Sequence, residues 1–266
     1  MSNTTNTETM TVTMSINERL SYIGNLKLSD DDRVLKLKSI QKKIEHKDNE
    51  EEASTVGGSL VSFVSGISNQ HKSDVLNSTL LAQLAANAKF NKEEEPKEWY
   101  SVYNEVLNNI GWNFPAFNFK KEDITSSTFT LDRKVLDILK AIADPREVSS
   151  VDRMMNSLNE DPENDKAVEL FDTVGMVGRQ GVFQIFPCAD DDTNVVMLST
   201  CLQFTASEHV TRFLWFKWKS KTVELWQSAQ KCVLVEDVYS QVRKQVIEKL
   251  GDRAVKYVIN IELGDF

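Results

Sequence analysis

Three cysteines, Cys188, Cys201 and Cys232, are the side chains of this 266-residue chain best suited to covalent chemistry. Cys201 lies in the middle of an apolar run at residues 195–204, and Cys232 lies in a second run of strand-forming residues. A thiolate can act as a nucleophile or carry a thioester, but this spacing forms neither a CxxC pair nor a zinc cluster. The odd number of cysteines predicts free thiols in a reducing compartment.

Only three histidines could act as a base for such a thiol: His46, His71 and His209. None has the spacing of a zinc-binding helix, so no metal site is predicted. An extended strand from Cys201 would hold His209 roughly 20 Å away, whereas proton transfer needs about 3 Å. A catalytic set of Cys201, His71 and Asp74 would require tertiary folding. The alternative is that His71 is a solvated residue at the start of a helix.

In a strand at positions 213–218, Phe213 and Trp215 would lie on one face, and Leu214, Phe216 and Trp218 on the other. A strand with this pattern is apolar on both faces and is expected in the core, although aromatic walls also suit an acyl chain. The acidic residues cluster in linkers and in first helical turns, where they oppose the helix dipole. We therefore assign them no acid or base role.

The composition limits the possible functions of the chain. A hydrophobic content of 41% is enough for a substantial core, and a net charge of -9 opposes binding to nucleic acid. We expect no compact face of Lys and Arg interleaved with aromatic residues. The polar N-terminus is unlike a secretory signal, and no apolar run reaches the roughly 20 residues of a membrane-spanning helix. The protein is predicted to be cytoplasmic as synthesised, with membrane contact only at the interface or through an attached lipid.

Hydrophobic periodicity predicts an α+β protein in which N-terminal helices pack on a C-terminal antiparallel meander. Residues 1–14 are predicted to be a disordered tail, and residues 15–266 a single domain, helical to about 171 and sheet-rich from 172. The predicted helices are 16–26, 31–46, 73–90 (with Ser73 and Asp74 as its cap), 96–110, 132–143, 148–158 and 236–250. The predicted strands are 182–186, 195–205, 210–219 and 222–235. A segment of small and apolar residues at 56–67 is interpreted as a buried helix or loop, or as a mobile, lipid-covering segment.

This succession of elements resembles the Erwinia virulence factor (Evf) family over about residues 16–263. The elements that carry the resemblance are the small-residue segment at 56–67, the helix at 73–90 and the meander that contains Cys201. The family is associated with plant-pathogenic bacteria that persist in insect guts. The resemblance implies an α/β protein of unusual topology, without assigned enzymatic activity, in which one cysteine carries a palmitoyl chain as a thioester.

Carried over to this chain, the resemblance makes Cys201 the best candidate for lipid attachment, because its flanks are the most apolar. Cys188, beside Pro187 and an acidic turn, is a weaker candidate, and Cys232 is intermediate. Cys201 lies in a predicted strand, whereas acylated cysteines usually lie beside a membrane or an amphipathic helix. The acyl chain would therefore be partly buried. Burial of about 15 methylene groups contributes on the order of 10 kcal/mol in either a protein or a bilayer.

The resemblance thus implies a bacterial virulence or persistence factor that is S-acylated, a lipoprotein whose partners are a fatty acyl chain and membrane lipid. It would be delivered to a host or associate with membranes after acylation. Apart from covalent palmitate, no cofactor is predicted. Two alternatives stay open. One is an enzyme that handles fatty acyl thioesters, with Cys201 as nucleophile and His71 as base. The other is an interaction module whose cysteines only fill core volume.

Overall fold

A nine-stranded mixed sheet forms the centre of the protein, for which the computed structural model describes residues 14–37, 45–191 and 193–264. The strands run in the order β11-β1-β2-β7-β8-β10-β3, with β4 paired to β10 and β6 paired to β7. Their bounds are β1 Glu52–Val56, β2 Ser59–Phe63, β3 Trp112–Asn113, β4 Lys120–Lys121, β6 Met176–Val177, β7 Gln180–Asp191, β8 Asn194–Thr205, β10 Glu224–Leu234 and β11 Val258–Ile261. The short strands β5 (Thr128–Phe129) and β9 (Trp218–Lys219) form a separate pair.

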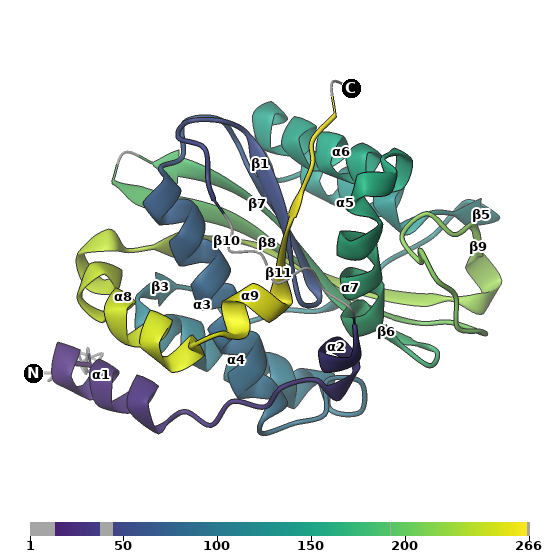
Figure 1. Cartoon of the computed structure of the whole chain (residues 1–266). Coiled ribbons are helices and arrows are strands. Elements are labelled where there is room, and N and C mark those ends of the chain that lie inside the picture. The colour runs from purple at the N-terminus through teal and green to yellow at the C-terminus, as the bar shows by residue number, and fades with distance from the viewer. Residues whose placement is uncertain (1–13, 38–44, 192, 265–266) are drawn as a thin grey trace, which may run out of the picture.

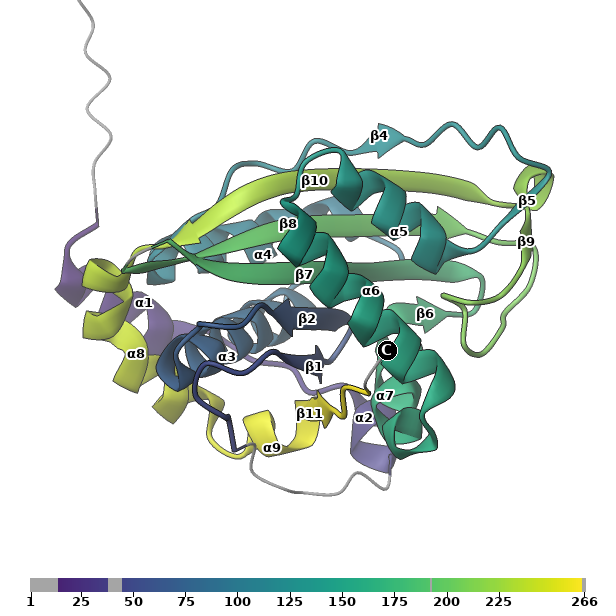
Figure 2. The same cartoon turned by 90° about the horizontal axis from the view of Figure 1, so that it is seen from above.

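Helices cover both faces of this sheet (Figures 1 and 2). On one face lie α1 (Ile16–Asn25), α3 (Asn69–Asn87), α4 (Pro96–Ile110) and α8 (Glu236–Leu250), and on the other lie α5 (Leu131–Lys140), α6 (Pro145–Glu160) and α7 (Asp165–Gly175). Two further short helices are α2 (Asp32–Lys36) and α9 (Arg253–Tyr257). Each face buries its own apolar cluster. The predicted α+β class is confirmed, but the helices enclose the sheet instead of packing on one side of it.

The segment at 56–67 was predicted to be a buried helix or loop: it is largely buried, and residues 64–67 form a loop, but residues 56 and 59–63 are strand and none of it is helix. It belongs to a hairpin in which β1 and β2 are joined through Gly57 and Gly58, inside the part of the chain predicted to be helical. Gly57 has φ +52°, a left-handed conformation that glycine adopts without strain. Because β2 pairs in parallel with β7, the sheet is mixed and not a simple antiparallel meander.

Residues 210–219 were predicted to form a strand, and this is wrong except at β9. The chain instead makes an irregular loop that is held by backbone hydrogen bonds from other elements. Arg212 adopts φ +52°, and its backbone N–H donates to the carboxylate of Asp172 on α7. The Leu131 N–H, at the start of α5, donates to the carbonyl of Leu214 at 2.9 Å. These contacts satisfy polar groups that a strand would have paired with a neighbouring strand.

Most helices occur close to their predicted positions. The helices predicted at 96–110 and 236–250 are confirmed as α4 and α8, and those at 132–143 and 148–158 correspond to α5 and α6. The helix predicted from Ser73 instead begins at Asn69, with Ser68 accepting a hydrogen bond from the His71 N–H, so the predicted cap is wrong. Residues 1–13 of the predicted tail and 38–44 of the helix predicted at 31–46 lie outside the described residues.

Candidate functional site

Cys201 lies in the middle of β8, opposite Gln184 of β7 and Ser228 of β10. Directly opposite residues of antiparallel strands point to the same face, and this face carries the larger apolar cluster, under α3 and α4. The thiol is completely buried. Its predicted apolar surroundings are therefore present.

The other two thiols lie on the same face of the sheet and are also buried. Cys188 and Cys232 both pair with Met197, from the two sides of β8. They are thus two strand spacings apart, roughly 9.6 Å, which is too far for a disulfide. The sulfur of each contacts only a carbonyl oxygen of its own strand, at 3.6 and 3.8 Å.

A buried hydrogen-bond network reaches Cys201 from the neighbouring elements. Ser59 Oγ donates to Gln184 Oε1 at 2.7 Å, and Gln184 Nε2 donates to the Tyr100 hydroxyl at 2.9 Å. Ser199 Oγ lies 3.5 Å from the Cys201 sulfur. Buried polar groups are normally paired, and this network pairs those of β2, β7 and α4. Among the described residues, Cys201 is the one cysteine whose sulfur has a hydrogen-bonding side chain, that of Ser199, as a neighbour.

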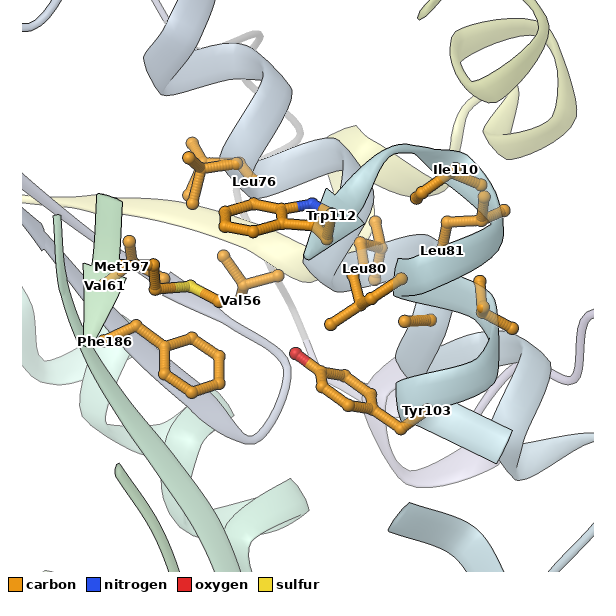
Figure 3. Close-up of a cluster of buried hydrophobic side chains, with 14 of the residues drawn as sticks. Val56, Val61, Leu76, Leu80, Leu81, Tyr103, Ile110, Trp112, Phe186 and Met197 are labelled. Atoms are coloured by element: carbon orange, nitrogen blue, oxygen red, sulfur yellow. The ribbon is translucent and has the colours of Figure 1, made fainter. Parts of the chain in front are cut away.

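Three polar atoms near this network have no hydrogen-bond partner among the described residues: Lys92 Nζ, Thr79 Oγ1 and the Tyr103 hydroxyl. Lys92 lies between α3 and α4, and its ammonium group lies 4.9 Å from the centre of the Trp99 ring. In Figure 3 the Tyr103 side chain extends from its helix with the hydroxyl directed into the apolar cluster. A buried polar atom without a partner costs free energy. A polar group placed between the sheet and α3 or α4 could recover that cost by a hydrogen bond to one of these atoms.

Burial dominates the electrostatics of the site. It raises the pKa of the Cys201 thiol to about 12, although the Ser199 and Tyr100 hydroxyls and the charge of Lys92 lower it. It also lowers the pKa of the Lys92 amine to about 8, against the opposing effect of Glu93. The pKa values of Cys188 and Cys232 are likewise raised by burial. The Cys201 thiol is thus protonated near neutral pH, and the Lys92 amine, whose charge acts on that thiol, loses its proton more easily than an exposed lysine does.

The structure does not bring His71 and Asp74 to Cys201. His71 Nδ1 lies 3.2 Å from an oxygen of Asp190, which pairs with Val195 in β8. Six residues of extended strand separate Val195 from Cys201, or roughly 20 Å. Asp74 is held instead by the guanidinium of Arg243, at 2.8 Å. The set of Cys201, His71 and Asp74 therefore does not form a triad in this structure.

The two other histidines are also engaged elsewhere. His46 Nδ1 lies 2.7 Å from Glu52, and His209 Nδ1 lies 3.0 Å from the Gly178 carbonyl oxygen. Within residues 14–37, 45–191 and 193–264, no three His, Cys, Asp or Glu side chains are grouped so that they could hold a metal ion. Of the basic side chains, Lys92 is the one whose charge lowers the pKa of the Cys201 thiol.

Sequence reasoning missed Lys92, Tyr100 and Gln184 as neighbours of Cys201. Gln184 had a signal, because it is the one polar residue in the middle of the apolar strand 182–186. A polar side chain at such a position must find a buried partner. Lys92 and Tyr100 had none, since their approach to the thiol depends on how α4 packs on the sheet.

No protein-family model matches this chain, and no curated protein sequence matches it. Solved structures with a weak likeness to this chain include the following three. A delta-endotoxin has a TM-score of 0.39 and 11% identity, covering 75% of this chain and 90% of its own. The activated Cyt2Ba monomer from Bacillus thuringiensis subsp. israelensis has a TM-score of 0.34 and 13% identity, covering 66% and 96%. The Evf virulence factor has a TM-score of 0.36 and 12% identity, covering 76% and 84%. Evf is thus a weak structural neighbour, without a sequence match to support membership of its family.

Lys92 Nζ has no hydrogen-bond partner among the described residues, so it is free to donate to a polar group, and the cluster on this face of the sheet is apolar. Among the described residues, no helix is both long and apolar enough to cross a bilayer.

Proposed function

We propose that this protein is a bacterial virulence or persistence factor that carries a fatty acyl chain as a thioester on Cys201 and acts at membranes, without classical enzymatic activity. The virulence role is what the sequence-level resemblance to the Evf family implies. The acyl-cysteine is supported by one observation above all: Cys201 is the thiol that combines an apolar surrounding with polar side-chain neighbours.

Acylation would proceed by exchange with an acyl thioester donor, such as an acyl-coenzyme A. The Cys201 sulfur bonds to the acyl carbonyl carbon, the bond from that carbon to the donor sulfur breaks, and the thiol proton passes to the donor sulfur. Lys92 in its neutral form can accept that proton on the way, because its pKa is lowered to about 8. The exchange uses up one donor and needs no oxidant or reductant.

The buried position of Cys201 sets a condition on this reaction. Because the sulfur is fully buried between β8 and the layer of α3 and α4, a donor reaches it only when that layer moves away from the sheet. Burial of the acyl chain contributes on the order of 10 kcal/mol, which can offset part of the lost packing. The same movement would release the chain toward a bilayer.

Intact mass measurement of the protein from its native source, before and after neutral hydroxylamine, tests the proposal. We expect an adduct with the mass of a long acyl chain that hydroxylamine removes and that maps to the Cys201 peptide. Cys201→Ser should lose the adduct, while Cys188→Ser and Cys232→Ser, at equally buried positions on the same sheet face, should keep it. An unmodified wild-type chain, or an adduct on another cysteine, would overturn the proposal.

A further inference from the structure

One end of the molecule is positively charged although the whole chain carries a net charge of -9. Two segments, residues 117–134 and 212–222, build this end, which we call the basic tip. They are joined by the pairing of β5 with β9 and by the Ser220 N–H, which donates to the Ser127 carbonyl at 3.1 Å. In Figure 2 the β5–β9 pair lies at the opposite end of the sheet from α1.

The basic tip combines eight basic residues with three acidic ones. The basic residues are Lys120, Lys121, Arg133, Lys134, Arg212, Lys217, Lys219 and Lys221, and the acidic ones are Glu122, Asp123 and Asp132. The difference of eight and three gives the two segments a charge of +5, and the remainder of the chain carries -14. Three of the basic residues pair with acids outside the segments: Lys121 with Glu224, Arg133 with Asp152, and Arg212 with Asp165. The positive field of the tip therefore comes mainly from its unpaired lysines. Such segregation directs a positive field outward from one end of an acidic protein.

Several of these cations are not neutralised within the protein. Lys121 pairs with Glu224 at 2.7 Å and Lys134 pairs with Glu122 at 3.0 Å. By contrast, four exposed lysines make no ion pair with any residue that the structure describes. These are Lys120, Lys217, Lys219 and Lys221. Their charge is available to an external anion.

A surface cavity of about 500 Å³ opens at the tip. Hydroxyl-bearing residues between positions 125 and 130 line it, together with Arg133, Lys134 and Lys217, and Asp137 is the acid on its wall. Hydroxyl and cationic donors around one cavity match the oxygen atoms of a phosphate or carboxylate group.

The tip also presents exposed aromatic surface. The Phe216 side chain is 37% exposed, and its ring centre lies 4.6 Å from that of Trp218. The guanidinium of Arg212 lies over the Trp215 ring at 5.1 Å. Aromatic rings beside lysines are typical of protein surfaces that lie at a bilayer interface.

We infer that the basic tip is the surface through which this protein binds an anionic lipid bilayer, with lipid headgroups at the Lys217 cavity and Phe216 at the interface. The inference rests on the proposed membrane function but not on the acyl chain. A flat bilayer touches only the tip, whereas a long nucleic acid would also meet the charge of -14 on the remainder of the chain. The exposed Phe216 ring favours lipid further.

Vesicle binding tests the inference, with vesicles of phosphatidylcholine alone and of phosphatidylcholine mixed with phosphatidylserine. The wild-type chain and Cys201→Ser should both bind the mixed vesicles, more weakly as salt rises, and Cys201→Ser should not bind phosphatidylcholine alone. The double variant Lys217→Gln/Lys219→Gln should bind about thirtyfold more weakly, from about 1 kcal/mol for each basic residue at an anionic surface. The matched control Lys27→Gln/Lys97→Gln removes two exposed lysines outside the tip and should change binding less than about twofold.

Three outcomes would overturn the inference: equal loss in both double variants, equal binding of Cys201→Ser to both kinds of vesicle, or tighter binding to duplex DNA than to vesicles. Because Cys201→Ser cannot carry the acyl chain on that residue, its result is independent of acylation. A failed vesicle test leaves the acyl-cysteine standing, and a missing acyl adduct leaves the basic tip standing.

Discussion

Replacement of Arg243 by methionine should lower the free energy of unfolding by about 3–5 kcal/mol near pH 7, because it leaves a buried charge without its partner. Arg243 on α8 donates from Nε to Asp74 Oδ1 at 2.9 Å and from Nη2 to Oδ2 at 2.8 Å. The Asp74 side chain is 0% exposed and that of Arg243 is 19% exposed. Methionine keeps much of the aliphatic packing of arginine, so the loss reports mainly on charge.

The penalty should depend on pH in a definite direction. Burial already raises the pKa of Asp74, and the Arg243 guanidinium is the main opposing influence. Without Arg243 the pKa of Asp74 rises further. A carboxyl group with a raised folded-state pKa contributes stability below its unfolded pKa, about 3.9, and loses it as pH rises through the folded pKa. The penalty should therefore be small near pH 4 and grow by up to about 1.4 kcal/mol per pH unit.

Equilibrium unfolding in urea, followed by circular dichroism at about pH 5 and pH 8, measures this penalty. The double variant Arg243→Met/Asp74→Asn is the control. An asparagine side chain carries no charge and can still accept the hydrogen bond that Gln70 donates to Asp74 at 3.0 Å. The double variant should recover most of the loss. A penalty that does not change with pH, or a double variant no more stable than Arg243→Met, would refute the reasoning.

Two further predictions concern buried polar groups. Burial raises the pKa of Asp172 to about 6. The protonated Asp172 carboxyl therefore contributes fully to the free energy of unfolding below about pH 4, and this contribution is lost as pH rises through 6. The total loss is up to about 3 kcal/mol. Asp172→Asn should remove this dependence in urea unfolding at about pH 4 and pH 7.5, and an unchanged slope would count against it. Tyr103→Phe should leave the free energy of unfolding unchanged or raise it by about 1 kcal/mol, since the Tyr103 hydroxyl has no partner among the described residues. Tyr100→Phe should lower it by about 1–2 kcal/mol, because the Gln184 amide is left unpaired. Thermal unfolding of the two variants compares them directly, and a larger loss for Tyr103→Phe would contradict the assignment of partners.

The helices that sequence reasoning predicted well are those with local signals at both ends. In α4, Pro96 stands in the first turn and Gly111 ends the helix with φ +115°. Proline and glycine at these positions act through their own backbone geometry, which does not depend on the rest of the fold. The start of α3 was predicted wrongly at Ser73, because Ser68 is the cap and the longer helix lets Lys72 reach Glu52 at 3.0 Å.

The errors fall where tertiary contacts override local pattern. In β1 and β2 both faces are covered by other elements, so the alternation of polar and apolar residues that marks a strand is absent. Residues 213–218 alternate like a strand, yet the loop is held by Asp172 and by the start of α5. The same misinterpretation hid the basic tip, because its two segments are about 80 residues apart in the sequence and the pairing of β5 with β9 brings them together.

For the site around Cys201, the sequence predicted the burial of the thiol but not its neighbours. Apolar flanks on both sides of Cys201 are a local property and indicate a core strand. Lys92 and Tyr100 come from an interhelical loop and from α4, about 100 residues earlier. Their approach depends on the way the helical layer packs on the sheet, for which a single sequence contains no direct signal.

The position of β11 has a consequence for the synthesis of the protein. β11 covers the outer edge of β1, with Val258 opposite Val56. A ribosome that adds about 5–20 residues per second needs roughly 10–40 s to make the intervening 200 or so residues. During that interval β1 has no partner on its outer side, and unpaired strand edges recruit strands from other chains. The outer edge of residues 52–56 is therefore protected only after residues 258–261 have been made and have paired with it.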